Sequence, residues 1–246
     1  MSGSTSHHDR EYVRFSPGRR VEHWVTMVTF TLLVLTGVPQ KFSEAGWARG
    51  LTWVFGGLHT MRWIHRINGF VMAAAFILHF ALGILFVIQG RKESLSIVPG
   101  KKDFTDAVQT LRYYLGLSDA QAKFDRYDYR QKFEYWGLIL GSIIMTATGL
   151  ILFFPVQVAN LLPGEAIPAA KLAHGNEGLL AFLTILIWHI YNAHLNPDVF
   201  PFDKTIFTGK ISRHRMEHEH PAELDRWDHD DGAAPGAAAA AQHKAG

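Results

Sequence analysis

The sequence predicts an all-α integral membrane protein, a four-helix bundle with both termini in the cytoplasm. Three observations predict this fold class. The chain has four apolar segments, each about as long as a bilayer core requires. Their apolar residues do not alternate as they do in barrel strands. The ends and the centre of the chain are polar although 48% of its 246 residues are hydrophobic. Because backbone exposed to lipid must satisfy its own hydrogen bonds, segments of this kind form helices.

The four predicted spans divide the chain into three regions. We expect a polar N-terminal segment at 1–20, a transmembrane domain at 21–195 with a central loop at 90–132, and a tail at 196–246 that is disordered from about 232. The first span follows about twenty polar residues and lacks a small-x-small cleavage site, so we expect it to be retained. The predicted spans are Val21–Val38, Ile67–Ile88, Phe133–Phe154 and Leu172–Leu195.

Basic residues predict the orientation of the helices. Nineteen of the 24 Lys and Arg residues lie in the N-terminal segment, the central loop and the tail, and five lie in the other two connections. The positive-inside rule therefore places both termini and the central loop in the cytoplasm, as in a multi-pass protein of the inner (cytoplasmic) membrane. The net charge of +2 is explained by membrane topology, and it indicates no nucleic-acid partner.

The chain contains no cysteine. This excludes disulfides, thiolate-bound iron-sulfur clusters, covalently attached haem and a cysteine nucleophile. Any redox chemistry must use cofactors that bind without a covalent bond.

Histidines lie at two depths of the predicted bundle. His65 and His174 begin the second and fourth spans at the outer face. His79 and His189 follow them by 14 and 15 residues, about 21 Å deeper in a helix, at the level where His23 begins the first span. Neutral imidazole is a common haem ligand, and a haem takes one ligand from each side. The outer pair is His65 with His174. For the inner pair, either His23 or His79 could oppose His189, and helical phase favours His79.

The remaining histidines give weaker signals. We expect His59 in the outer interface, and His194 near the inner boundary as an alternative ligand of a third haem. Four further histidines stand among Glu and Asp in the tail, where we expect a solvated surface: His214, His218, His220 and His229.

Four short runs of sequence resemble the cytochrome b subunit of membrane-bound formate dehydrogenases, and more widely the prokaryotic cytochrome b subunits of hydrogenases and thiosulfate reductases. They are Arg19-Arg20-Val21-Glu22-His23-Trp24, Ile64-His65-Arg66, Gln131-Lys132-Phe133 and Trp188-His189-Ile190-Tyr191. The resemblance runs from about Phe15 to Pro221.

The resemblance implies two b haems, an outer one on His65 and His174 and an inner one on His23 and His189. His79 departs from this family pattern. The His65-x13-His79 and His174-x14-His189 spacings are similar to those of cytochrome b in quinol to cytochrome c oxidoreductases. His79 therefore stays an alternative inner ligand.

The function implied is electron transfer between a redox partner subunit and the quinone pool, menaquinone or ubiquinone, by a chain that is not catalytic alone. The partner would be an iron-sulfur protein or a multihaem cytochrome c, because Tyr191 to Asp198 looks like a branch that works beside multihaem cytochromes. The resemblance places the quinone near Gln131 and Lys132, with Asp128 where the formate dehydrogenase subunit carries Asn. A haem-free membrane anchor and a histidine-based metal-ion carrier are the alternatives, but an anchor has no need of histidines at matched depths.

Two connections have patterns of their own. In the central loop, apolar residues recur at three-to-four spacing between basic ones, which predicts an amphipathic helix on the inner membrane surface or against a partner; they are Phe104, Ala107, Val108, Leu111, Tyr114 and Leu115, flanked by Lys101, Lys102 and Arg112. The outer connections Trp47 to His59 and Pro155 to Ala170 predict either a docking surface for the partner or interfacial helices.

Overall fold

The computed structural model describes residues 10–91, 95–197 and 199–233. It divides into two compact units. The bundle unit comprises Glu22–Leu85 and Trp136–Asp203, and the terminal unit comprises Met1–Val21, Phe86–Tyr135 and Lys204–Gly246. The two are described separately.

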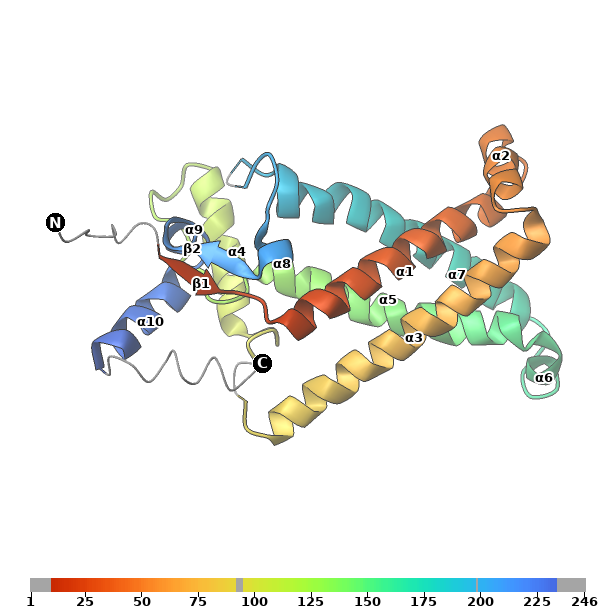
Figure 1. Cartoon of the computed structure of the whole chain (residues 1–246), viewed down its shortest axis with the longest axis horizontal. Helices are drawn as coiled ribbons and strands as arrows, with labels where there is room; N and C mark the ends of the chain where they lie inside the picture. Colours follow the sequence, from red (N-terminus) through yellow and green to blue (C-terminus); the bar gives the residue numbers. More distant parts are fainter. Residues whose placement is uncertain (1–9, 92–94, 198, 234–246) are drawn as a thin grey trace. The chain divides into compact units, whose positions relative to one another are not determined.

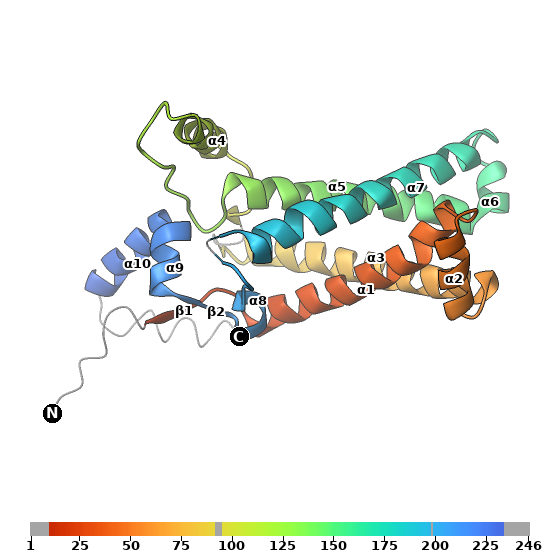
Figure 2. The ribbon, with the colours of Figure 1, turned by 90° about the horizontal axis from the view of Figure 1, so that it is seen from above.

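Four long helices run alongside one another in the bundle unit (Figures 1 and 2). They are α1 (Pro17–Lys41), α3 (Leu58–Ile88), α5 (Tyr129–Phe153) and α7 (Ala166–Leu183), the last continued by the π-helical turns η3 (Thr184–His189) and η4 (Tyr191–Leu195). All four are long and apolar enough to cross a membrane. The predicted all-α fold with four membrane helices is confirmed.

All four long helices begin earlier than the hydropathy pattern predicts, α3 and α7 by the most. The helix α3 starts nine residues before Ile67, and α7 starts six residues before Leu172. Both extensions are more polar than the spans that they precede, and so hydropathy alone does not find them. They place His65 and His174 inside helices rather than at helix starts.

Two short helices join the long ones at one end of the bundle (Figure 2), α2 (Gly46–Val54) and α6 (Pro155–Ala159). The turn after α2 contains Gly56 and Gly57 with φ of +79° and +94°, a conformation that glycine adopts without strain. Trp53 on α2 is 81% exposed. The structure thus has helices in both outer connections, as one of the two interpretations of these segments expected.

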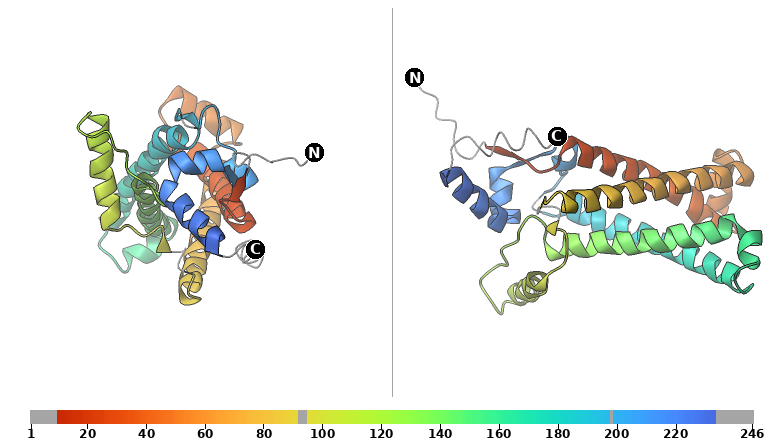
Figure 3. Two further views of the ribbon diagram at one scale, coloured as in Figure 1. Left: turned by 90° about the vertical axis from the view of Figure 1, so that its left-hand side faces the viewer. Right: turned by 90° about the horizontal axis from the view of Figure 1, so that it is seen from below.

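The terminal unit joins β1, early in the chain, to the C-terminal part of the described residues (Figure 3). The strand β1 (Glu11–Val13) pairs antiparallel with β2 (Lys210–Ser212), and α8 (Thr205–Thr208), α9 (Arg213–Glu219) and α10 (Pro221–Ala233) lie along the C-terminal part. Its small core consists of Tyr12, Ile211, Met216 and Leu224, with Trp227 packed against it. Sequence analysis did not predict this two-stranded sheet, because strands of three residues leave no periodic signal.

The tail has a structure that the sequence analysis did not predict in detail. His214, His218 and His229 are exposed as expected, but the prediction of a solvated His220 is wrong, since that side chain is 3% exposed. The reason is that β2 pairs with the N-terminal segment and gives the tail a core to pack on. The chain is helical to Ala233, and the rest of the segment predicted to be disordered, 234–246, lies outside the described residues.

The central loop contains the predicted amphipathic helix, α4 (Lys101–Tyr114). Its apolar residues are largely uncovered, with Phe104 75% and Leu111 58% exposed. Asp103 accepts a hydrogen bond from the backbone N–H of Gly100 at 2.6 Å and so caps the first turn.

Candidate functional site

His65 and His174 face each other across the bundle unit, from α3 and α7. Their ring centroids lie 6.2 Å apart with the ring planes 77° to each other. This is the pair that the histidine depths predicted for the outer level.

Each of these two rings is held by a threonine. Thr36 Oγ1 lies 2.9 Å from His65 Nδ1, and Thr148 Oγ1 lies 3.0 Å from His174 Nδ1. A glycine follows each threonine, and a Cβ placed on Gly37 would come within 2.8 Å of His65 Cε1. At Gly149 the corresponding distance to His174 Cε1 is 3.3 Å. Each ring therefore packs against the backbone of a glycine, in space that a larger residue would fill.

His23 and His189 form a second pair in the same unit. Their ring centroids lie 6.3 Å apart with an interplanar angle of 33°. His189 is the last residue of η3, where hydrogen bonds run from i to i+5. Such turns take more residues than α-helical turns, so they change the direction of the side chains that follow.

His79 hydrogen-bonds to a carboxylate. Its Nδ1 lies 3.0 Å from Glu22 Oε2, on the residue that precedes His23. The three histidines expected at the inner level therefore lie in one unit, with His23 and His189 ring to ring and His79 against Glu22.

The spacing of both pairs fits a haem iron between two imidazoles. A metal–imidazole bond is about 2 Å long and the nitrogen lies about 1.1 Å from the ring centre, so two coaxial ligands have centroids about 6.2 Å apart. The observed separations are 6.2 and 6.3 Å. Within the described ranges, no three His, Cys, Asp or Glu side chains gather as a metal cage. The histidine rings instead form pairs, and two is the number of ligands that a six-coordinate haem takes from the protein.

The weaker histidine candidates have other contacts. The ring of His194 stacks on Phe202 at 4.4 Å, and its Nδ1 accepts a hydrogen bond of 3.3 Å from the backbone of Asp203. His59 Nε2 accepts a hydrogen bond of 3.2 Å from the indole of Trp63. Each of these two rings is therefore held by residues that lie close to it in the sequence.

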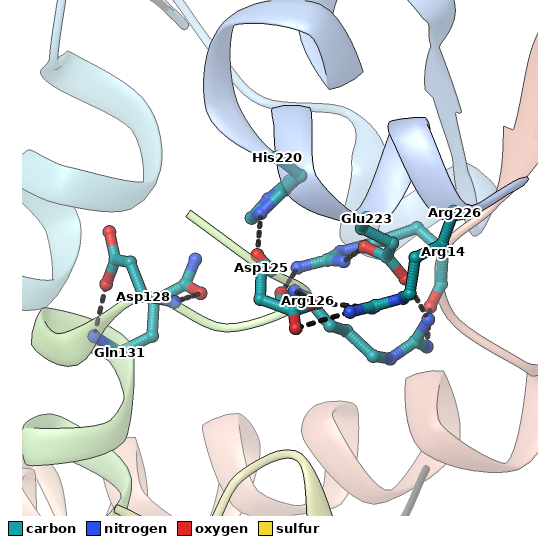
Figure 4. Close-up of polar contacts among 8 residues, drawn as sticks. All are labelled: Arg14, Asp125, Arg126, Asp128, Gln131, His220, Glu223 and Arg226. Atoms are coloured by element: carbon teal, nitrogen blue, oxygen red, sulfur yellow. Dashed lines mark hydrogen bonds and ion pairs between the residues drawn. The ribbon is translucent and has the colours of Figure 1, made fainter. Parts of the chain in front are cut away.

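The predicted quinone residues lie in the terminal unit at the start of α5. Asp128, 6% exposed, and Gln131 form a reciprocal capping box (Figure 4). The carboxylate of Asp128 accepts the Gln131 N–H at 2.8 Å, and the Gln131 side chain accepts the Asp128 N–H at 3.2 Å. Arg130 also donates to Asp128, and Lys132 pairs with Asp103 at 2.9 Å. Each of the three residues therefore stabilises the local fold.

A buried charge cluster in the terminal unit was not predicted (Figure 4). Glu223, 2% exposed, accepts hydrogen bonds from Arg14 at 2.7 Å and from Arg126 at 2.8 Å. The Arg14 side chain is 4% exposed, and burial lowers its pKa although Glu223 opposes this. Since the partners are more than 90 residues apart in sequence, no local pattern could indicate the cluster.

Two titratable groups border this cluster. Burial, followed by the positive charge of Arg14, lowers the pKa of His220 to about 3, and its Nδ1 lies 2.7 Å from the carbonyl oxygen of Asp125. Hydrogen bonds from Arg226 lower the pKa of the Asp125 carboxyl. His220 is therefore a neutral, buried donor to the segment before α5.

Sequence analysis also missed side chains in the bundle. Thr36 and Thr148 could have been found by their Thr-Gly pairs, but such pairs are too short to be specific. Glu177 is an ionisable residue inside a membrane helix, which by itself indicates function. A Cβ on Gly141 would lie 2.6 Å from Glu177 Oε1, so this glycine leaves room for the carboxylate beside α5.

Comparison with known proteins gives consistent matches over most of the chain. A family model described as prokaryotic cytochrome b561 matches residues 14–200. The cytochrome b556 subunit of the nitrate-inducible formate dehydrogenase of Escherichia coli K12 is 26% identical over 208 residues, 85% of this chain and 86% of its own. The cytochrome b556 subunit of Haemophilus influenzae formate dehydrogenase is 27% identical over 200 residues, 78% of this chain and 75% of its own.

Proposed function

Because this chain belongs to the prokaryotic cytochrome b561 family, we propose that it binds two b haems, one between His65 and His174 and one between His23 and His189. It is a membrane cytochrome b, an electron-transfer subunit of a respiratory oxidoreductase. The observation that carries the ligand assignment is the pair of ring separations, 6.2 and 6.3 Å, each of which suits one iron.

The chain's own residues bind and orient the cofactors. Haem b supplies reversible one-electron chemistry when bound. The four histidines would hold the two haems, and Gly37 and Gly149 leave the space that the rings of His65 and His174 occupy. Since α7 and its π turns carry both His174 and His189, fifteen residues apart, one helix sets the distance between the two sites at about 22 Å.

The relatives of the chain and its charge distribution support a proposal for its partners. We propose that a redox subunit docks on the outer side and that quinone exchanges electrons on the inner side. The distribution of Lys and Arg supports this orientation in the inner membrane. The named relatives are formate dehydrogenase subunits, which supports a dehydrogenase-type partner.

A haem count on the purified full-length protein tests the ligand assignment. We expect about two haems in a pyridine haemochrome assay, one haem in His23→Ala and in His65→Ala, and two in His79→Ala, which is the matched control. Loss of a haem in His79→Ala but not in His23→Ala would transfer the inner site to the other ligand. No haem in the unmodified protein would leave a membrane anchor as the better interpretation.

Reduction by a quinol tests the second part of the proposal. Adding a soluble menaquinol or ubiquinol analogue to the oxidised protein should give the reduced b-type spectrum, with the faster analogue indicating the quinone type. We expect Lys132→Ala to slow this reduction while the haem content stays at two. Equal rates in this variant and the unmodified protein would remove Lys132 from the quinone site.

A further inference from the structure

The hydroxyl groups of Thr36 and Thr148 are oriented toward the histidine rings by backbone hydrogen bonds. Thr36 Oγ1 lies 2.6 Å from the carbonyl oxygen of Leu32, and Thr148 Oγ1 lies 2.6 Å from that of Ile144. A hydroxyl has one proton to donate, and a carbonyl can only accept. Each threonine therefore donates to its own helix and presents a lone pair to the imidazole.

This arrangement fixes the tautomer of both histidines. Because the threonine oxygen is the acceptor, the proton of the imidazole lies on Nδ1, at 2.9 Å in His65 and 3.0 Å in His174. The other ring nitrogen, Nε2, then carries the free lone pair. A neutral imidazole must have this tautomer to bind iron through Nε2.

The glycines next to the threonines fix the rings from a second side. Gly37 and Gly149 lie against the Cε1 atoms, and the added Cβ distances of 2.8 and 3.3 Å leave little space there. Each ring is thus held at Nδ1 by the hydroxyl and at Cε1 by bare backbone, which restricts its rotation about the Cβ–Cγ bond. The two rings held in this way stand at 77° to each other.

We propose that Thr36 and Thr148 are positioning residues that set the orientation and the reduction potential of the haem between His65 and His174. The proposal rests on the proposed function, since it needs a haem at this pair. A hydrogen bond from Nδ1–H to an oxygen makes the imidazole a stronger electron donor to the iron. It therefore stabilises ferric haem and lowers the potential of this site relative to the same site without the hydroxyls.

Valine replaces threonine with nearly the same shape and no hydroxyl, so Thr36→Val and Thr148→Val are the test variants. Potentiometric titration of the purified protein should show one of two haem components shifted to higher potential in each variant, and shifted further in the double variant. Thr36→Ser keeps the hydroxyl, so its haem should have the reduction potential of the unmodified protein. Thr31→Val is the matched control, because Thr31 also donates to the carbonyl four residues earlier on α1, at 2.8 Å, but is solvent- or lipid-exposed.

Electron paramagnetic resonance gives a readout that separates the two sites. The anisotropy of a low-spin ferric haem signal depends on the angle between its two imidazole planes, which is 77° at one pair and 33° at the other. The valine variants should change the more anisotropic signal, that of the nearly perpendicular pair, and leave the other unchanged.

Three results would overturn the proposal. The first is an unchanged potential and signal in both valine variants that keep two haems. The second is a shift in Thr31→Val as large as in Thr36→Val. The third concerns the case in which the valine variants lose the haem. Thr36→Ser should then still bind it, because it keeps the hydroxyl, and a serine variant that also lacks the haem would refute the positioning role of the threonine. An unmodified protein without haem would refute the proposed function instead.

Discussion

Replacing Glu223 by alanine tests the energy of the buried charge cluster in the terminal unit. The carboxylate is 2% exposed and binds Arg14, itself 4% exposed, and Arg126. The variant leaves a buried guanidinium without its counter-charge, which costs about 3–5 kcal/mol. The matched control is Glu11→Ala, since the Glu11–Lys210 pair is 2.9 Å long but more than half exposed on both sides, and such pairs contribute about 0–1 kcal/mol.

Hydrogen exchange followed by mass spectrometry measures this difference on the full-length protein. Each 1.4 kcal/mol changes an opening equilibrium about tenfold. Exchange of the α9 and α10 amides should therefore accelerate by roughly 10²- to 4 × 10³-fold in Glu223→Ala and by less than about sixfold in Glu11→Ala. Equal acceleration in the two variants would show that burial does not determine the strength of these ion pairs, and the reasoning would be refuted.

Three further outcomes are expected. Gly37→Ala should remove or perturb the haem at His65, because its Cβ would lie 2.8 Å from Cε1 of that ring, whereas Gly50→Ala, with open space around it, should keep both haems in the haemochrome assay. His220 has a pKa of about 3 in the fold, below the unfolded value of 6.5, so its contribution is present above pH 6.5 and is lost as the pH falls toward 3. As the pH falls from 6.5 toward 3, the free energy that protects the α10 amides from exchange should fall by about 1 kcal/mol per pH unit. In His220→Gln this free energy should depend much less on pH. Asp128→Ala removes the cap of α5 and should cost about 0.5–2 kcal/mol, measured as faster exchange in the first turn of that helix.

Hydropathy predicted the membrane helices because a bilayer core requires about twenty apolar residues, and that requirement is met locally in the sequence. The amphipathic helix α4 was predicted for the same reason, from spacing within one segment. The terminal unit was not, because β1 and β2 lie about 200 residues apart and the charge cluster joins three distant segments. Interactions of this kind have no local pattern.

The histidine depths predicted which residues the structure brings together at His65 and His174. For the inner level, helical phase favoured His79 over His23, whereas the structure puts His23 ring to ring with His189 and His79 against Glu22. That argument used 100° per residue along the whole fourth helix, but His189 ends a π-helical segment, for which this angle does not hold. It also did not consider Glu22, whose carboxylate lies against Nδ1 of His79.

The two halves of the bundle unit are built alike. In the first half, a Thr-Gly pair near the end of α1 holds the histidine of α3, 29 residues later, and in the second half the same pair on α5 holds the histidine of α7, 26 residues later. Each half also has a short helix between its two long ones, α2 in the first and α6 in the second. The match comprises three residues with unequal spacing, which is too little to appear as a sequence repeat. It nevertheless means that each half supplies one oriented imidazole, so the His65–His174 site exists only where the two halves pack together.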